Sequence, residues 1–329
     1  MEDLQSLVDI PRIWEQLDRV DERLLEASTA EDAYLTKIAQ HLLLAGGKRF
    51  RPLLALLAAE FGEVANGRPV EAGVAVELIH VGSLYHDDVI DEADIRRGQT
   101  SANANWTNTV AILAGDFLMA RASEVAATHL SQESVRLLAA TYADLVEGQT
   151  RELQYQNDLT HTIDDYFQVI GGKTASLIRT SARLGAMATD AGDEVVEALS
   201  TWAWEVGMVF QIADDALDLV ADEATIGKPA GSDIREGTFT GPVLMAAAEP
   251  GAERIGRLLG DGTPYRDDTI AEVIGIVRDG GYVDHSLSDA HQRLRVASDA
   301  LAALPEGKPR AILETLGGFL LDRVEAVAP

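Results

Sequence analysis

Apolar residues recur every three or four positions over much of the chain, the spacing that places them on one face of an α-helix. The repeat is clearest over residues 13–25, 33–44 and 135–153, and we predict an amphipathic helix for each. Residues 195–219 are apolar on most faces, so a helix there is expected to be central. Strand-length alternation joined by Asn-Gly or Asp-Gly turns is not found in the sequence. The pattern predicts an all-α fold.

Two short motifs predict where helices begin. Ser28-x-x-Glu31 fits a capping box, and Thr162-x-x-Asp165 is an acidic version of it. The helical pattern is interrupted at residues 46–47, 98–105, 227–241 and 250–251. None of these breaks has the length or biased composition of an interdomain linker. We therefore predict a single domain over residues 1–329.

Composition narrows the class of protein. Of the 329 residues, 54 are acidic and 27 are Lys or Arg, which gives a net charge of -27 and disfavours nucleic acid as a partner. Cysteine is absent, so disulfides, thiolate catalysis and cysteine-ligated metals are excluded. No run of apolar residues reaches the length of about 18 that a transmembrane helix needs, so no transmembrane segment is predicted. The acidic residues 1–5 lack the pattern of a signal peptide, and a cytoplasmic location is expected.

Two aspartate clusters share the pattern D-D-x-x-D: Asp87, Asp88 and Asp91, and Asp214, Asp215 and Asp218. On a helix, the first and last members of each cluster lie on one face, where like charges repel. Both clusters stand in largely apolar segments, and carboxylates taken out of water need a counter-charge. Mg²⁺ suits such oxygen ligands. An EF-hand is excluded because its sixth loop position, normally Gly, is Glu92 or Leu219 here.

Basic residues stand out because this acidic chain has few of them. Lys48, Arg49 and Arg51 lie within four residues, and Arg96 and Arg97 follow the first aspartate cluster. Two further lysines, Lys173 and Lys228, stand beside glycines. Arg binds phosphate with two hydrogen bonds and Lys neutralises it as a point charge. Together with the aspartates, these residues indicate a polyphosphate substrate held through Mg²⁺.

Five stretches resemble the trans-isoprenyl diphosphate synthases, or polyprenyl synthetases. They are GGKRFRP from Gly46, LIHVGSLYHDDVIDEADIRRG from Leu78, GGKTASL from Gly171, FQIADDALDL from Phe210 and GKPAGSDIREG from Gly227. They occur in the family's order within a core of about residues 46–242. The resemblance implies the all-α isoprenoid synthase fold, with antiparallel helices around a central cavity, and a homodimer. The chain departs from the family's usual Thr-Leu-Pro at Gly241.

The resemblance also implies the reaction, a Mg²⁺-dependent 1′-4 head-to-tail trans condensation of isopentenyl diphosphate with an allylic diphosphate primer. The departing diphosphate would leave an allylic cation, which the double bond of isopentenyl diphosphate attacks. The implied catalytic set is the six aspartates with Lys173 and Thr174. Three Mg²⁺ ions per site would be held by Asp87, Asp91 and Asp214. The allylic diphosphate would be bound by Arg96, Lys173, Gln211 and Lys228, and isopentenyl diphosphate by Lys48, Arg51, His80 and Arg97.

Product length is expected to depend on Gly82 and Ser83. Ser83 lies one helical turn, about 6 Å, before Asp87. In the resembling family an aromatic residue near this position closes the cavity and stops elongation. Small residues leave it open, so we predict a medium- or long-chain product, from hexaprenyl to nonaprenyl diphosphate. Tyr85 would affect the product length if its ring turned into the cavity.

Alternative functions remain to be separated from this one. A short-chain geranylgeranyl or farnesyl diphosphate synthase differs only in product. A class I terpene cyclase would lack the site formed by Lys48, Arg51 and His80. A His-Asp metal phosphohydrolase, suggested by His80 and His86, leaves the second aspartate cluster unexplained. A non-catalytic partner subunit of a two-chain synthase would tend to lose aspartates, and all six are present.

Overall fold

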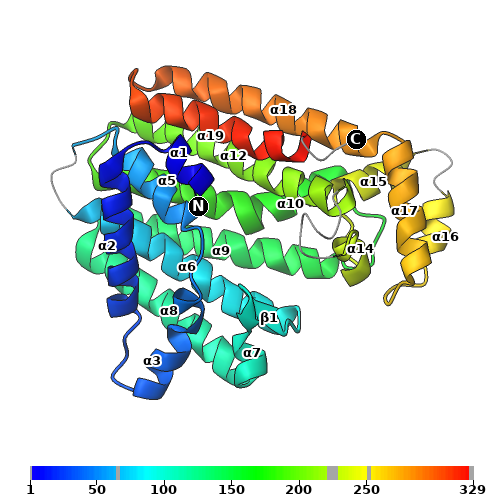
Figure 1. The fold of residues 1–329 in the computed structure, drawn as a ribbon, viewed down its shortest axis with the longest axis horizontal. Coiled ribbons are helices and arrows are strands. Elements are labelled where there is room, and N and C mark those ends of the chain that lie inside the picture. Colours follow the sequence, from blue (N-terminus) through cyan, green and yellow to red (C-terminus); the bar gives the residue numbers. More distant parts are fainter. Residues whose placement is uncertain (1, 64–66, 221–228, 250–252, 326–329) are drawn as a thin grey trace. The chain divides into compact units, whose positions relative to one another are not determined.

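The computed structural model describes residues 2–63, 67–220, 229–249 and 253–325, and these are helical almost throughout (Figure 1). The chain divides into two compact units. The first comprises Met1–Tyr142, Leu177–Ser200 and Ala303–Pro309, and the second Ala143–Ser176, Thr201–Ala302 and Arg310–Pro329. The all-α class is confirmed, whereas the single-domain organisation stays a prediction.

The first unit is built around one long helix, α6. Its elements are α1 (Glu2–Leu7), α2 (Pro11–Ala27), α3 (Ala33–Ala39), α4 (His41–Leu44), α5 (Phe50–Ala59), α6 (Arg68–Ile90), β1 (Ile95–Arg96), β2 (Gln99–Thr100), α7 (Ala102–Asn105) and α8 (Asn108–His129). The unit also takes in parts of α9 (Gln132–Gln154), α11 (Ser176–Ala188) and α12 (Asp193–Val220). Helix α6 packs along α8, and also against α5 and α2.

Apolar residues on every face explain why α5 and α6 are central. In α5 all residues from Pro52 to Ala59 are buried, and in α6 all residues from Ala72 to Ile79 are buried. A helix that is apolar all round is stable only inside a core. Helix α6 then ends at Ile90, with Asp91 as its C-cap. The core helix therefore carries the first aspartate cluster at its carboxyl end.

The second unit contains the rest of α9 and α12. Its other elements are α10 (Ile163–Ile170), the π-helical turn η1 (Gly171–Ala175), α14 (Ser232–Glu236), α15 (Gly241–Ala248), α16 (Glu253–Leu259), α17 (Asp267–Asp279), α18 (Tyr282–Ala300) and most of α19 (Lys308–Glu325). Its core gathers buried residues such as Met208, Ile212, Val243, Val277 and Leu321. In the described part of the chain, no helix has both the length and the apolar character needed to cross a bilayer.

Of the two predicted capping boxes, one is confirmed and the other is wrong. Thr162 and Asp165 form the predicted capping box at the start of α10, with both reciprocal hydrogen bonds present. The box at Ser28 is wrong, because Ser28 ends α2 and its hydroxyl donates to Leu24 O at 2.7 Å. The next helix starts later, where Asp32 accepts a hydrogen bond from Leu35 N at 2.8 Å. An anionic side chain at this position also suits the positive end of a helix.

Candidate active site

The first aspartate cluster combines buried and accessible carboxylates. Asp88 is fully buried, and its Oδ1 accepts a hydrogen bond from Arg96 Nε at 2.6 Å. Its Oδ2 is buried without a hydrogen-bond partner, and burial raises the pKa of Asp88 while Arg96 lowers it. Asp87 is half-buried and Asp91 is exposed. The carboxyl end of a helix is itself partially negative, so this end of α6 favours a bound cation.

Arg96 and Arg97 are carried by a two-stranded hairpin that the sequence did not predict. Arg96 pairs with Gln99, so Arg97 and Gly98 form its turn, with φ values of 52° and 75°. Positive φ at both central residues defines a type I′ turn, which costs glycine nothing but strains arginine. Two carbonyl oxygens hold Arg97 in place, since its Nη1 donates to Leu42 O at 2.9 Å and to Gly46 O at 2.5 Å.

Two residues expected to bind isopentenyl diphosphate, Arg51 and His80, are half-buried near Arg97. Arg51 has a buried Nε without a hydrogen-bond partner. Burial lowers its pKa, and Glu77 opposes this effect. Burial, together with the charges of Arg51 and Arg97, lowers the pKa of His80 well below its usual value, so its imidazole is neutral at neutral pH. Lys48 is exposed. Arg51 and Arg97 thus form a desolvated cationic group with a neutral histidine beside it.

Sequence reasoning missed the buried carboxylate that balances these arginines. Glu77 is only 2% exposed, and its Oε1 lies 3.0 Å from Arg49 Nη1 and 3.8 Å from Arg97 Nη2. Burial raises the pKa of Glu77, and the arginines, Arg49 first, lower it. Arg49 also pairs with Asp21 at 2.6 Å. A single glutamate inside the apolar run of α6 was the available signal, because a buried carboxylate requires a partner.

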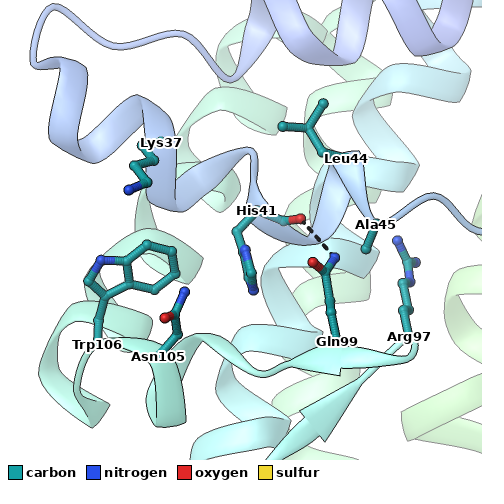
Figure 2. Close-up of a pocket in the computed structure, with 8 residues that line it drawn as sticks. All are labelled: Lys37, His41, Leu44, Ala45, Arg97, Gln99, Asn105 and Trp106. Carbon is teal, nitrogen blue, oxygen red and sulfur yellow. Dashed lines mark hydrogen bonds between the residues drawn. The ribbon is translucent and has the colours of Figure 1, made fainter.

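A pocket of about 420 Å³ lies beside Arg97 in the first unit (Figure 2). It is lined by Lys37, His41, Leu44, Ala45, Arg97, Gln99, Asn105 and Trp106. His41 packs edge-on against Trp106, with ring centroids 5.1 Å apart, and its Nε2 lies 2.7 Å from Thr100 O. The Gln99 amide donates to His41 O at 3.4 Å. These contacts tie α4 to the hairpin that presents Arg96 and Arg97.

The second aspartate cluster lies in α12. Asp214 is exposed, while Asp215 and Asp218 are buried. Asp218 Oδ2 accepts a hydrogen bond from the backbone N–H of Asp233 at 3.2 Å, which connects the helix to α14. The cluster thus presents Asp214 to solvent and uses at least one carboxylate for internal contacts.

Asp215 is one member of a chain of four polar side chains. Its Oδ2 accepts a hydrogen bond from Tyr166 Oη at 2.6 Å, and its Oδ1 accepts one from Gln211 Nε2 at 2.8 Å. Gln211 Oε1 in turn accepts from Thr174 Oγ1 at 2.9 Å. Burial raises the pKa of Tyr166 far above its usual value, so its phenol remains a donor. Burial also raises the pKa of Asp215, and the hydrogen bond from Tyr166 lowers it in part.

The GGKTA segment forms a π-helical turn between α10 and α11. Such turns are rare and are common at functional sites. The turn lies close against α9, since a Cβ added to Gly148 would stand 2.6 Å from Lys173 N. Lys173 is paired with Glu152, a residue of α9 that the sequence did not single out. Lys173 and Thr174 are therefore placed by a distorted helix rather than by a loop.

Three residues near the expected cavity floor lie on α6. Gly82 is buried, and a Cβ there would stand 3.0 Å from Met119 Cε and 3.1 Å from Gly115 O. Ser83 is half-buried, and its hydroxyl donates to His80 O at 2.8 Å. Tyr85 is fully buried, and its hydroxyl donates to Ile38 O at 2.5 Å. Tyr85 therefore serves the packing of α3 against α6.

The expected residues fall into two groups, one in each unit. The first unit holds Lys48, Arg51, His80, Gly82, Ser83, Asp87, Asp88, Asp91, Arg96 and Arg97. The second holds Lys173, Thr174, Gln211, Asp214, Asp215 and Asp218. The structure brings Arg96 to Asp88, Gln211 to Asp215 and Thr174 to Gln211. Lys228 lies outside the described residues.

Comparisons with known proteins decide the family. The sequence pattern of the family described as "Polyprenyl synthetase" matches residues 32–277. The chain belongs to the polyprenyl synthetase family. Nonaprenyl diphosphate synthase of Mycobacterium tuberculosis is 41% identical over 307 residues, which cover 92% of this chain and 91% of that protein. Heptaprenyl diphosphate synthase component 2 of Geobacillus stearothermophilus is 37% identical, with coverage of 93% and 95%.

A solved structure extends the similarity to the whole fold. Geranylgeranyl pyrophosphate synthase from Corynebacterium glutamicum, complexed with calcium and isoprenyl diphosphate, is 38% identical and covers 97% of each chain with a TM-score of 0.84. These findings confirm the predicted family, the isoprenoid synthase fold and the prenyltransferase class. The calcium in that relative is in keeping with the dependence of the polyprenyl synthetase family on a divalent metal ion.

The carboxylates of this polyprenyl synthetase fit a hard divalent cation. Their donors are all oxygens, and Asp88 Oδ2 is buried without a partner. Among the described residues, no three His, Asp or Glu side chains converge to hold an ion by themselves. Mg²⁺ is commonly bound through one or two carboxylates, with water and substrate phosphates completing its shell. Such a donor set suits a metal that arrives with its diphosphate.

Proposed function

We propose that this polyprenyl synthetase condenses isopentenyl diphosphate with an allylic diphosphate, in a 1′-4 head-to-tail trans reaction that yields a polyprenyl diphosphate. One observation carries the proposal: in one unit, aspartates that suit a hard cation accompany half-buried arginines that suit a phosphate. A terpene cyclase needs only the aspartates. The cationic group of Arg51 and Arg97 has a use when a second diphosphate substrate binds.

The allylic diphosphate is proposed to bind through metal ions and through direct contacts with polar side chains. Its metal ligands would be Asp87, Asp91 and Asp214, with three Mg²⁺ ions per site, and its direct contacts Arg96, Lys173, Gln211 and Lys228. When bound, Mg²⁺ supplies positive charge that stabilises the departing diphosphate. Arg96, anchored by Asp88, and Lys173, anchored by Glu152, add fixed positive charge without needing to reorganise.

Isopentenyl diphosphate is proposed to bind Lys48, Arg51, His80 and Arg97. Arg97 is already held by two carbonyl oxygens, so little side-chain freedom would be lost on binding. The double bond then attacks the allylic cation, and the proton released from the new product passes to the departed diphosphate. No protein nucleophile is required. The allylic cation must not be captured by a nucleophile, and for this reason an uncharged oxygen such as Thr174 Oγ1 suits its surroundings.

The product is proposed to be of medium or long chain, from hexaprenyl to nonaprenyl diphosphate. The small residues Gly82 and Ser83 support this length, as does Tyr85, because its hydroxyl is bonded to Ile38 O of α3. Similarity to a nonaprenyl diphosphate synthase supports it as well. A short-chain product is the second candidate, because a geranylgeranyl pyrophosphate synthase is also similar.

A second copy of the chain is proposed as the partner. On α8, Ile112 and Leu113 are 41% and 58% exposed, and on α9, Val146 and Leu153 are 48% and 47% exposed. Exposed apolar helix faces of this kind support burial against another subunit. One relative is named component 2 of a heptaprenyl diphosphate synthase, so assembly with a different partner chain is the alternative outcome. The cytoplasmic location expected from the sequence stays a prediction.

One assay tests the activity. The purified protein is incubated with Mg²⁺, isopentenyl diphosphate and allylic primers of increasing length, and product masses are measured. We expect a ladder ending at a medium or long chain and no turnover after EDTA. Asp87→Ala and Asp214→Ala should each lower turnover by orders of magnitude. Asp18→Ala and Asp284→Ala, at exposed helical positions, are matched controls. Phosphate release without chain elongation would contradict the proposal.

A further inference from the structure

The polar chain from Tyr166 to Thr174 has a defined direction. Tyr166 Oη donates to one oxygen of Asp215 and Gln211 Nε2 donates to the other at 2.8 Å, so the Nε2 end of the Gln211 amide faces Asp215. The Oε1 end must then face Thr174, and it accepts the single hydroxyl hydrogen of that residue. Thr174 Oγ1 is left with lone pairs only. The chain of hydrogen bonds therefore makes Thr174 an acceptor toward any further group.

An acceptor is the useful state for this hydroxyl in prenyl transfer. The allylic fragment is neutral in the bound substrate and becomes cationic as its diphosphate departs. A lone pair directed at that fragment stabilises the transition state more than the ground state, which is the condition for raising kcat. A hydroxyl hydrogen directed at the cation would destabilise it. The orientation of the Gln211 amide thus has a catalytic consequence.

Tyr166 completes the chain at the opposite end. Its ring is 5% exposed and lies in the core of the second unit, on the helix whose start is fixed by the Thr162 capping box. A Cβ added to Gly241 would stand 3.1 Å from Tyr166 Cε1, so the chain's departure to glycine makes room for this ring. Its hydroxyl occupies Asp215 Oδ2 at 2.6 Å. Without it, that oxygen would be buried and unpaired, and the carboxylate could turn away from Gln211.

We propose that Tyr166 is a positioning residue for prenyl transfer: through Asp215 and Gln211 it keeps the lone pairs of Thr174 directed at the allylic cation. The inference rests on the proposed function, because it requires that a cation forms beside Thr174. Tyr166 itself touches no substrate. Its effect is expected in kcat rather than in the KM of either substrate.

The first test compares two Tyr→Phe variants in the second unit. Tyr166→Phe keeps the ring and removes only the hydroxyl. Tyr155→Phe is the matched control, because its hydroxyl makes only a 3.3 Å contact with Asp165 and lies outside the chain of hydrogen bonds. We expect kcat of Tyr166→Phe to fall about tenfold, with both KM values within about twofold, and Tyr155→Phe to match the wild type. A Tyr166→Phe variant with the kcat of Tyr155→Phe would overturn the inference.

The second test does not depend on turnover. The probes are a dimethylammonium analogue of the five-carbon allylic diphosphate and its neutral isopentyl counterpart, and their Kd values are measured with Mg²⁺ by calorimetry. In the wild type the ammonium probe should bind more tightly. In Tyr166→Phe this preference should shrink several-fold, while the neutral probe keeps its Kd, which also shows that the variant is folded. An unchanged preference overturns the inference, as does equal binding of both probes by the wild type.

The two tests separate the inference from the proposed function. If the wild type elongates primers and both Tyr variants behave alike, the function stands and the role of Tyr166 fails. If the wild type makes no prenyl product, the function fails. The probe affinities then still decide whether the hydroxyl of Tyr166 controls the response of the site to positive charge.

Discussion

Ser83 provides a test of product length at a single position. It lies one turn before Asp87 on α6, and its hydroxyl bonds back to His80 O, so the side chain occupies little space. Ser83→Phe adds an aromatic ring at this position, and we expect shorter products by mass spectrometry. Ser83→Ala is the control and should give the wild-type product. Unchanged product length in Ser83→Phe would remove Ser83 from the cavity floor.

His80 makes folding stability depend on pH. Burial lowers the pKa of His80 in the folded state, so between that pKa and about 6.5 the unfolded chain binds more protons. The free energy of unfolding therefore rises with pH across this window, and His80's contribution is lost as pH falls. His80→Gln lacks this titration. The wild type's advantage over it should shrink from about pH 7.5 to about pH 5.5, by at most ~1.4 kcal/mol per pH unit.

Urea unfolding at several pH values measures this difference. Ser83→Ala, a substitution in the same helix that adds no titrating group, should follow the wild-type pH dependence. Parallel curves for the wild type and His80→Gln would show that the imidazole does not titrate differently in the two states. The measurement needs no substrate, so it tests the surroundings of His80 independently of the reaction.

The residues that sequence analysis missed share one property, which is that each contacts a predicted site residue. Glu77, Glu152 and Tyr166 each hold a predicted residue in place. Motif spacing identified Arg97, Lys173 and Asp215 because their chemistry is evident from their type and neighbours. It could not identify their partners, because those contacts join elements up to 49 residues apart.

At the scale of elements, close packing of α9 against the π-helical turn should be essential. Gly148→Ala would place a Cβ 2.6 Å from Lys173 N, so the backbone of the turn must move. We expect a loss of about 1–3 kcal/mol in stability and a lower kcat. Gly275→Ala in α17, where a Cβ meets nothing within 4 Å, is the matched control and should gain up to about 1 kcal/mol. Equal melting temperatures and activities for the two variants would contradict this packing argument.

Helix periodicity predicted the long elements well and the irregular ones poorly. The expected helices at residues 13–25, 135–153 and 195–219 correspond to α2, α9 and α12. Residues 33–44 instead form two short helices, α3 and α4. The hairpin at Arg97 and the π-helical turn depend on backbone conformation, which a pattern of apolar positions does not report. Both irregular elements carry predicted site residues.

At the scale of the whole molecule, the net charge of -27 bears on assembly. Two such chains repel each other, so a homodimer must be held by apolar burial, and salt should strengthen it by screening the repulsion. An interface held by ion pairs would respond in the opposite way. Raising the salt concentration therefore distinguishes the two kinds of interface before any residue is changed.

Substitution of Ile112 and Leu113 should dissociate this dimer. Their side chains are exposed on α8, and glutamates there would place charge inside the proposed apolar contact. Light scattering should give about twice the chain mass of 35.3 kDa for the wild type, and the monomer mass for the double variant Ile112→Glu and Leu113→Glu. Thr128→Glu, exposed on the same helix, adds charge elsewhere and should remain dimeric. A monomeric wild type would favour a different partner chain, and a dimeric double variant would place the contact on another face.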